Sequence, residues 1–328
     1  MNATVEPTVS VIIPAYNCDR YIVQAVESVL SQEQCSYELI VIDDGSTDQT
    51  EDLLKSYGDR LNYIKQENQG VAAARNHGIE VAQADFVAFL DADDYFLPGK
   101  LARQAQILLQ RPDLGMIHSG WQRVDEQGHK LLDVSPWEQI PELNLATWLR
   151  WKPVLPSAMM FRREWLQYVG GFDPRFPPAE DTNLVLKLAL KGCKTCWLRE
   201  ITVCYRQHES SAMYKGLPQA NSLMAVTEDF FGQSNLPPEI RLMEQSVRYG
   251  TLVWIAWYLY HTGHTQEMKQ YLQKAWAYRP HSVIDTLVTW IESFAEFARS
   301  WGVEFQSHKL TRSPEWQELL QWMLKVTK

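Results

Sequence analysis

Residues 89–101 read FLDADDYFLPGKL, the end of an apolar strand that turns abruptly into Asp91, Asp93 and Asp94. Three carboxylates held together at the end of a strand repel one another unless a cation or hydrogen-bond donors compensate their charge. The carboxyl ends of parallel strands face the crevice in which α/β proteins bind ligands. Carboxylate oxygens suit Mg²⁺ or Mn²⁺, and Mg²⁺ usually binds one or two carboxylates together with substrate phosphates. The segment therefore indicates a metal–nucleotide site, with an acidic loop that caps a helix starting near Pro98 as the alternative.

The composition is that of a soluble globular protein with room for one large or two modest domains. The chain has 328 residues, of which 45% are apolar and 22% are charged, and its formal net charge is −9. Binding of nucleic acid generally needs a basic surface that faces the phosphates. The negative charge therefore argues against a general role in binding nucleic acid.

The chain carries no sequence signal for a membrane span or for secretion. The best apolar candidate, residues 251–260, is too short to cross a bilayer, which needs about 20 apolar residues. No charged start precedes an apolar segment at the N-terminus, as a signal peptide would require. The five scattered cysteines fit a reducing compartment. We therefore expect a cytoplasmic protein, with any membrane contact peripheral and at the inner face.

Strands and helices alternate in the first half of the chain, which implies a mostly parallel sheet flanked by helices. Apolar runs predict strands over residues 9–14, 37–42, 61–65 and 85–90. Helical spacing predicts helices over residues 22–32, 70–82 and 98–110. A further helix is expected to end at Leu54, with Thr47 or Asp48 as its cap. From about residue 116 the pattern is mixed, with strands expected over 116–124, 157–161 and 203–207 and helices over 164–169 and 183–191.

The last third of the chain has a different character, because helical patterns replace the alternation. Helices are expected over residues 224–231, 240–260, 265–277 and 282–300. Tryptophan is dense here, at Trp254, Trp257, Trp276, Trp290, Trp301, Trp316 and Trp322. Such an aromatic stripe favours a helical core, and a surface that contacts a membrane or a protein is the alternative. We predict an α/β domain over residues 1–216 and a C-terminal helical region over 217–328.

Four segments form an ordered series in the first domain. They are VIIPAYN at 11–17, VIDDGSTD at 41–48, NQGVAAARNHG at 68–78 and FLDADD at 89–94. The series resembles the family 2 glycosyltransferases with the GT-A fold, over roughly residues 7–210. The resemblance implies a Rossmann-like catalytic domain that uses a nucleotide-sugar and inverts the anomeric centre.

The resemblance implies that residues of the first two segments contact the base of the nucleotide. The first loop would lie along the base, through Pro14, Ala15, Tyr16 and Asn17. Asp44 would accept a hydrogen bond from the base, typically the N–H of a uracil, because a carboxylate can only accept. Asp43 is expected to serve the turn instead.

The resemblance also assigns residues to the ribose, the diphosphate and the metal. Gly70 would let the backbone approach an anion at a helix start, where amide groups favour negative charge. Arg75 would face the nucleotide or pair with an acidic residue of the site, and a purely structural ion pair is an equal alternative. Asp91 is expected near the ribose and metal-bound waters, and Asp93 as a direct metal ligand. His208, in the segment YRQH, would touch the metal or diphosphate, with a surface loop residue as its alternative.

The segment PAEDT at 178–182 looks like the family's acidic catalytic motif. The resemblance makes Asp181 the general base that takes the proton of the acceptor hydroxyl, and Glu180 the residue that orients the acceptor. The alternative is that Asp181 or Thr182 only caps the helix over 183–191. A helix N-terminus would also keep Asp181 ionised, as a base must be.

These features together predict an inverting glycosyltransferase that needs Mg²⁺ or Mn²⁺. The donor is expected to be a nucleotide-sugar, with a UDP-sugar favoured by Asp44. The acceptor would be a saccharide or lipid-linked hydroxyl in polysaccharide or glycolipid synthesis. A sugar-1-phosphate nucleotidyltransferase is an alternative, but its phosphate loop is rich in Gly and Arg, whereas this chain has PAYN. The other alternative is a non-catalytic nucleotide-sugar-binding or scaffold protein whose Trp-rich helices dock a partner.

Overall fold

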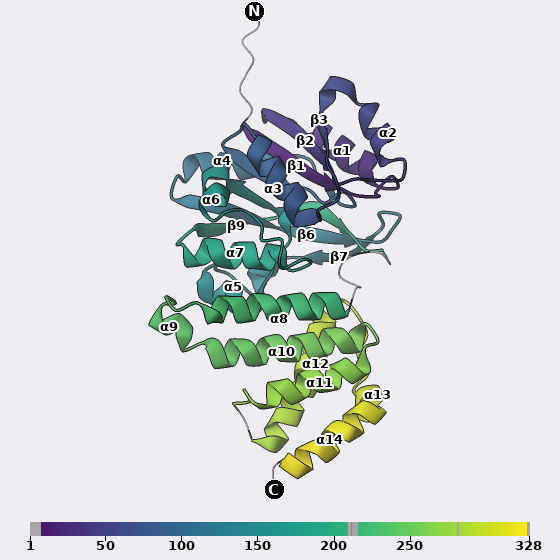
Figure 1. The fold of residues 1–328 in the computed structure, drawn as a ribbon, viewed down its shortest axis with the longest axis vertical. Coiled ribbons are helices and arrows are strands. Elements are labelled where there is room, and N and C mark those ends of the chain that lie inside the picture. Colours follow the sequence, from purple (N-terminus) through teal and green to yellow (C-terminus); the bar gives the residue numbers. More distant parts are fainter. Residues whose placement is uncertain (1–7, 209–210, 212–215, 281, 327–328) are drawn as a thin grey trace, which may run out of the picture. The chain divides into compact units, whose positions relative to one another are not determined.

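The computed structural model of the chain describes residues 8–208, 211, 216–280 and 282–326. The chain divides into two compact units, Met1–Glu209 and Ser210–Lys328 (Figure 1). The first unit is a mixed α/β structure built on one sheet, and the second is helical.

The first half of the sheet is parallel and carries the strands that the apolar runs predict. Its order is β3 (Asn62–Lys65), β2 (Tyr37–Asp43), β1 (Val9–Ala15), β4 (Phe86–Phe89). Four helices follow these strands: α1 (Ile22–Leu30), α2 (Thr50–Lys55), α3 (Val71–Val81) and α4 (Lys100–Gln110). Every residue of β1 and of β4 is buried, because helices cover both faces of a parallel sheet.

Alternate residues of β1 pack against different helices, as the two-residue period of a strand requires. Val9, Val11 and Ile13 belong to the apolar core that also includes buried residues of α1 and α4. Ile12 faces the other side, where α3 crosses the sheet. A Cβ on Gly78 of α3 would lie 2.3 Å from Cγ2 of Ile12, so only glycine permits this close approach.

The second half of the sheet is mixed in direction. From β4 it continues through β8 (Met159–Arg162), β6 (Leu114–Val124), β9 (Lys194–Arg206) and β5 (Tyr95–Phe96), with β7 (Lys130–Val134) paired to β6. β6 and β9 run parallel, and the other pairings of these strands are antiparallel. The helices of this half are α5 (Leu145–Trp151), α6 (Arg163–Tyr168) and α7 (Glu180–Leu190). A sheet flanked by helices confirms the predicted fold class.

Several boundaries differ from the prediction, since β9 begins at Lys194 and not at residue 203, and α8 (Leu217–Gly232) begins at Leu217 and not at residue 224. Helix α4 begins at Lys100 and not near Pro98, because Gly99 before it adopts a left-handed conformation with φ of +77°. Strand β8 begins at Met159, because residues 156–158 form a short 3-10 helix. Helix α7 begins at Glu180, three residues earlier than expected, so the acidic motif forms its first turn.

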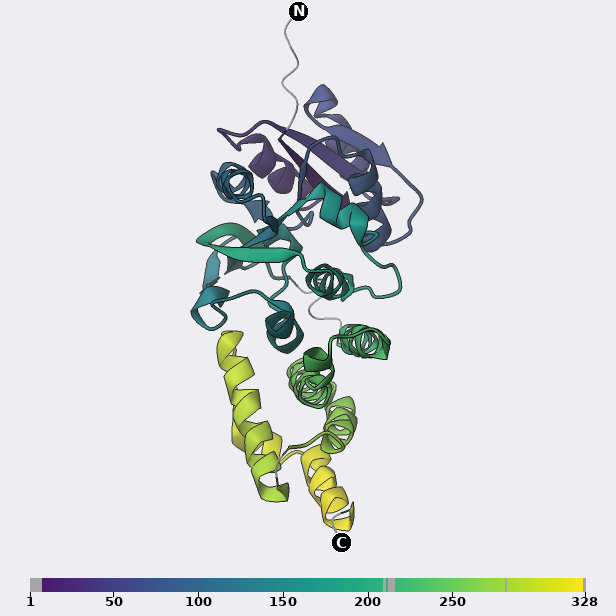
Figure 2. The ribbon, with the colours of Figure 1, turned by 90° about the vertical axis from the view of Figure 1, so that its left-hand side faces the viewer.

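The second unit consists of helices in the part of it that the structure describes. They are α8 (Leu217–Gly232), α9 (Pro238–Arg241), α10 (Glu244–His261), α11 (Thr265–Trp276), α12 (Val283–Ser300), α13 (Ser307–Thr311) and α14 (Pro314–Val326). Figure 2 views α8, α10 and α11 nearly end-on, as neighbouring coils. Trp257, Trp290 and Trp316 are at most 2% exposed, so these members of the aromatic stripe are core residues.

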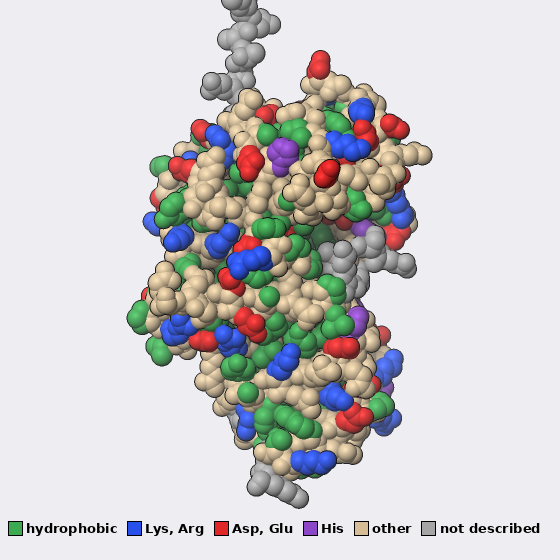
Figure 3. Space-filling model, viewed as in Figure 1, with side chains coloured by type: hydrophobic (Ala, Val, Ile, Leu, Met, Phe, Trp, Pro, Cys, Tyr) green, Lys and Arg blue, Asp and Glu red, His purple; other side chains and the backbone are tan. Residues whose placement is uncertain are grey.

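The surface does not carry a basic stripe on the face drawn in Figure 3, where acidic and basic side chains are interspersed over each unit. Along the parts of the chain that the structure describes, no helix is both long enough and apolar enough to cross a bilayer.

Candidate active site

The loops at the carboxyl ends of β1 and β2 are tied to each other. Ala15 ends β1 opposite Asp43 of β2, and Pro14 lies within the buried strand. Asn17, with φ of +46°, accepts a hydrogen bond from the Thr47 amide on its side-chain oxygen at 2.8 Å. Tyr16 is 52% exposed and is therefore free to stack on a planar ligand.

Asp44 is buried and holds the loop that leads into α3. Its Oδ1 accepts hydrogen bonds from Nε2 of Gln66 at 2.7 Å and from the Gln69 amide at 2.9 Å. Its Oδ2 accepts one from the amide of Gly70 at 2.7 Å, where φ is +88°. Asp43 accepts bonds from its own turn, as the sequence indicates, through the amide of Ser46 at 2.8 Å.

Arg75 of α3 joins the two acidic motifs. Its Nη2 lies 2.6 Å from Oδ1 of Asp91, and its Nη1 lies 2.6 Å from Oε1 of Glu180. The Arg75 and Glu180 side chains are each 5% exposed, and the guanidinium packs over the ring of Phe172. Burial alone would lower the pKa of Arg75, but the charges of Asp91 and Glu180 raise it above its ordinary value. Arg75 therefore pairs with acidic residues of the site, one of the alternatives that its position in the sequence leaves open.

Asp93 and His208 approach each other at the end of β9. Oδ2 of Asp93 lies 2.8 Å from Nε2 of His208, and the two side chains are 31% and 10% exposed. The His208 ring packs on the ring of Tyr21, with 5.2 Å between centroids. The described residues contain no group of three His, Cys, Asp or Glu side chains arranged to hold a metal ion. Two protein ligands nevertheless fit Mg²⁺ or Mn²⁺ when substrate phosphates and water complete the coordination.

Both carboxylate oxygens of Asp94 accept hydrogen bonds from the protein. It is 1% exposed and accepts hydrogen bonds from the Arg206 amide at 3.0 Å and from Oγ of Ser157 at 2.8 Å. Burial, followed by the charges of Asp93 and Asp91, raises the pKa of Asp94 well above its ordinary value. Its carboxyl group therefore links residues 91–94, the acidic turn that follows β4, to β9.

Asp181 lies in the first turn of α7, next to Glu180. Burial and the charge of Glu180 raise the pKa of Asp181 to about 7, although Arg75 acts in the opposite direction. The sequence predicts that the helix N-terminus keeps Asp181 ionised, whereas desolvation and the charge of Glu180 raise its pKa, so that the carboxyl group is only partly ionised near neutral pH. A pKa near neutrality suits a general base, since it balances the ionised fraction against proton affinity. The N-cap of α7 is Ala179, so neither Asp181 nor Thr182 is the cap.

Arg206 and Ser157 are site residues that the sequence does not single out. The Ser157 hydroxyl accepts from the Asp91 amide at 3.1 Å while it donates to Asp94. Arg206 donates to the carbonyl oxygen of Asp93 at 2.9 Å. Both residues act on partners far away in the chain, and no local pattern signals such contacts.

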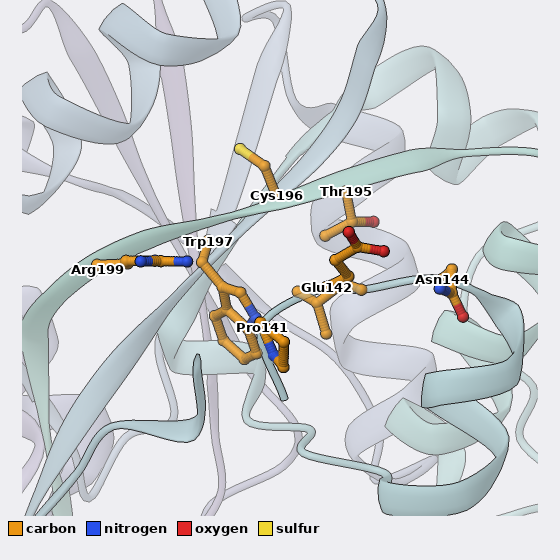
Figure 4. Close-up of a pocket in the computed structure, with 8 residues that line it drawn as sticks. Pro141, Glu142, Asn144, Thr195, Cys196, Trp197 and Arg199 are labelled. Atoms are coloured by element: carbon orange, nitrogen blue, oxygen red, sulfur yellow. The ribbon is translucent and has the colours of Figure 1, made fainter. Parts of the chain in front are cut away.

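A separate pocket of about 370 Å³ opens between the start of β9 and the segment before α5 (Figure 4). Its lining comprises Pro141, Glu142, Leu143, Asn144, Thr195, Cys196, Trp197 and Arg199. None of the nucleotide, metal or catalytic candidates lines it, so we do not assign the donor to this pocket.

Comparison with known proteins identifies a shared family. The family model described as glycosyl transferase family 2 matches residues 10–170. An uncharacterized glycosyltransferase from Rickettsia typhi, RT0329, is 30% identical over 234 residues, which are 69% of this chain and 72% of the relative. Seven of the other curated relatives are matched over between 19% and 65% of their own length.

Two solved structures share the fold. TarS of S. aureus, in complex with UDP-GlcNAc, superposes with a TM-score of 0.60 and 19% identity, covering 91% of this chain and 93% of that one. The mannosyltransferase PcManGT of Pyrobaculum calidifontis, in complex with GDP-Man and Mn²⁺, gives 0.59 and 20%, covering 91% and 84%. At these identities the likeness concerns the fold alone.

Proposed function

The chain belongs to glycosyltransferase family 2, and from this we propose that it transfers a sugar from a nucleotide-diphosphate donor to a hydroxyl acceptor with inversion. The observation that carries the proposal is the pair of contacts made by Arg75. Through them Asp91, expected at the donor, and Glu180, beside the expected base, are held by one guanidinium. Donor and acceptor chemistry would therefore meet at one edge of the sheet.

The donor that the site favours is a UDP-sugar. Oδ2 of Asp44 accepts one hydrogen bond from the protein, and a carboxylate oxygen can accept a second one from a base N–H. Tyr16 is exposed beside it and offers a ring on which a base can stack. Both solved relatives described above were studied with a nucleoside-diphosphate sugar, UDP-GlcNAc in one and GDP-Man in the other.

The metal would be Mg²⁺ or Mn²⁺, held by Asp93 and His208, with Asp91 acting from the ribose side. The PcManGT complex contains Mn²⁺, which supports a divalent ion in this fold. When bound, such an ion stabilises negative charge on the diphosphate leaving group. Oδ1 of Asp91 is taken by Arg75, which leaves Oδ2 for the donor.

Asp181 is the proposed general base. Its carboxylate takes the proton of the acceptor hydroxyl, and the oxygen attacks the anomeric carbon from the face opposite the diphosphate. The bond from the anomeric carbon to the diphosphate oxygen breaks, and its electron pair leaves with the nucleotide. One in-line displacement inverts the configuration. Glu180, fixed by Arg75, would orient the acceptor through Oε2, which is buried and has no hydrogen-bond partner among the described residues.

The acceptor that we propose is a saccharide or lipid-linked hydroxyl in polysaccharide or glycolipid synthesis. The enzyme would then act in the cytoplasm or peripherally at the inner face of a membrane, and the Trp-rich helices of the second unit would be the docking region. A sugar-1-phosphate nucleotidyltransferase or a non-catalytic scaffold is less consistent with membership of this family and with the presence of both Asp93 and Asp181.

Thermal stabilisation by a panel of UDP, GDP, dTDP, CMP and ADP, with and without Mn²⁺, tests the proposal. A ligand that binds only the folded state raises the melting temperature. We expect UDP to raise the melting temperature only when Mn²⁺ is present. Asp93→Ala should abolish this rise. Asp59→Ala, a change at an exposed position, should retain it. No rise with any nucleotide would contradict the donor site. A rise with GDP only would keep the site and overturn the choice of UDP.

A further inference from the structure

Arg206, the last residue of β9, is a buried arginine surrounded by neutral acceptors. It is 2% exposed. Its Nε donates to the carbonyl oxygen of Asp93 at 2.9 Å, and its Nη1 donates to those of Glu126 at 2.8 Å and Asp125 at 3.3 Å. Its Nη2 donates to Oε1 of Gln24 at 2.6 Å. One guanidinium thus binds the acidic turn, the tip between β6 and β7, and α1.

Aromatic rings provide the rest of its surroundings. The guanidinium carbon lies 4.8 Å from the ring centroid of Tyr21 and 5.5 Å from that of Tyr95. Ring faces attract a cation, which offsets part of the cost of burying the charge. Tyr21 also packs on His208, and the backbone amide of Arg206 donates to Asp94. Tyr21 therefore connects Arg206 with His208, and Asp94 connects it with the acidic turn.

We infer that Arg206 is a positioning residue for the donor site: it fixes the backbone of Asp93, and thereby the direction in which the Asp93 carboxylate faces His208. This inference rests on the proposed function for its catalytic consequence, but the positioning itself is a property of the chain. The guanidinium would act on the metal site only through Asp93, because its Nε, Nη1 and Nη2 already donate to protein acceptors.

Lysine cannot reproduce this arrangement. Arg presents a planar fork whose nitrogens reach acceptors in several directions, whereas Lys carries its donors on one nitrogen. Arg206→Lys keeps the positive charge but cannot serve Asp93, Glu126 and Gln24 together. The variant therefore separates geometry from charge.

Arg162 of β8 is a matched control. It too donates to backbone carbonyls, from Nε to Leu114 at 2.7 Å and from Nη2 to Leu108 at 2.6 Å, and its guanidinium packs over the ring of Phe86 at 5.3 Å. None of these partners is a candidate site residue. Arg162→Lys therefore removes the same kind of guanidinium hydrogen bonds to backbone carbonyls, in a different part of the same unit.

Amide hydrogen exchange tests the positioning without any ligand. The Asp94 amide donates to the Asp91 carbonyl and the Phe96 amide to Oγ of Ser28, so this segment contains protected amides. We expect Arg206→Lys to accelerate exchange over residues 90–96 and Arg162→Lys to leave it unchanged there. Equal exchange over 90–96 in the two variants would overturn the inference.

The Mn²⁺ concentration that gives half of the UDP-dependent stabilisation tests the functional consequence. Loss of a residue that orients a metal ligand typically costs about 10- to 100-fold in metal affinity, so we expect at least a tenfold rise for Arg206→Lys. We expect a change of less than about twofold for Arg162→Lys, which is remote from the metal ligands. A similar change in the required Mn²⁺ concentration for both variants would contradict the inference about Arg206 and leave the proposed function intact. Absence of any UDP and Mn²⁺ effect in the unaltered chain would instead contradict the proposed function, and the exchange result would still decide the positioning.

Gln24→Met provides a second variant if Arg206→Lys does not fold. It removes one acceptor of the guanidinium from an exposed position of α1 and leaves the arginine in place. We expect the same two changes as for Arg206→Lys, each smaller in size. Unchanged exchange over 90–96 together with unchanged Mn²⁺ dependence would count against the inference.

Discussion

Nη1 of Arg75 lies 2.6 Å from Oε1 of Glu180, although 105 residues separate the two in the chain. Both side chains are buried, and the same guanidinium also binds Asp91. The contact makes the first turn of α7 and the end of β4 parts of one site. Its energetic and catalytic consequences can be measured separately.

Removing the cation from this contact should destabilise the fold. Arg75→Met leaves Glu180 buried without its partner, and breaking a buried pair typically costs about 3–5 kcal/mol of unfolding free energy. Glu180→Gln alone leaves the guanidinium with Asp91 and should cost less. Urea unfolding of both single variants and the double variant measures the coupling. Strictly additive effects would mean that the two side chains do not interact.

Asp181→Asn should abolish transfer and preserve donor binding. The amide cannot take a proton, and loss of a general base typically lowers kcat by about 10²- to 10⁴-fold. Steady-state kinetics gives kcat, and thermal stabilisation by UDP and Mn²⁺ reports the donor. Asp59→Asn, on the exposed surface, should leave both unchanged. Retention of kcat in Asp181→Asn would remove this residue from the mechanism.

The pH dependence should follow the raised pKa of Asp181. Activity should increase as the carboxyl group ionises, with a limb in kcat/KM near pH 7, because burial raises its pKa to about 7. The free energy of unfolding should change with pH in the opposite direction to the activity. The folded state holds this proton more tightly than the unfolded state, so the contribution is full below pH 3.8 and is lost as the pH rises to about 7.

Asp181→Asn serves as the reference for that pH profile. The difference in unfolding free energy between the unaltered chain and the variant should shift against the unaltered chain between about pH 4 and pH 7. Denaturant unfolding at fixed pH values measures it. A difference that stays constant over this interval would show that the folded-state pKa of Asp181 is not raised.

Asp44→Asn should loosen the loop before α3. An amide carries one acceptor oxygen and would turn its NH₂ group toward donors that Asp44 now satisfies, at Gln66, Gln69 and Gly70. Leaving a buried amide unsatisfied typically costs about 1–3 kcal/mol. We expect a lower melting temperature and weaker stabilisation by UDP. If only UDP binding falls, Asp44 recognises the base without supporting the loop.

Gly78→Ala should destabilise the first unit, because the added methyl group meets Ile12 at 2.3 Å. Overpacking of this kind typically costs about 1–3 kcal/mol. Gly250→Ala in α10 is the matched control, since an added Cβ there has nothing within 4 Å and alanine favours a helix. Urea unfolding should therefore move in opposite directions for the two variants. Equal stability of Gly78→Ala and the unaltered chain would mean that α3 can shift away from β1.

The first half of the sheet could be predicted because its signals are local. Buried runs such as Val9–Ala15 are apolar apart from Ser10, and the acidic turn follows β4 directly. The position of Asp91 at the end of β4 follows from that pattern. The start of α7 at Glu180 could not be predicted in the same way. Its first turn contains two acidic residues, Glu180 and Asp181, and so lacks the apolar spacing that indicates a helix.

Other features of the site depend on interactions between distant segments. The pKa of Asp181 depends on burial by other elements, which a helix position alone does not reveal. Arg206 sits in a segment noted for its histidine, yet its acceptors lie 80 to 182 residues away. Asp44 stands at the expected strand end, but its partners in the loop before α3 belong to a different stretch of chain.

The place of β9 in the sheet has a consequence for synthesis of the chain. Strand β5, which directly follows the acidic turn, pairs with β9 through Tyr95 and Phe96. The bond from the Arg206 amide to Asp94 spans 112 residues. The parallel strands β1 to β4 can therefore pair while the ribosome still holds the later segments, but the acidic turn stays without its sheet partner until β9 emerges. Such long-range pairing slows folding, so nascent chains should acquire the nucleotide loops early and the metal-binding geometry last.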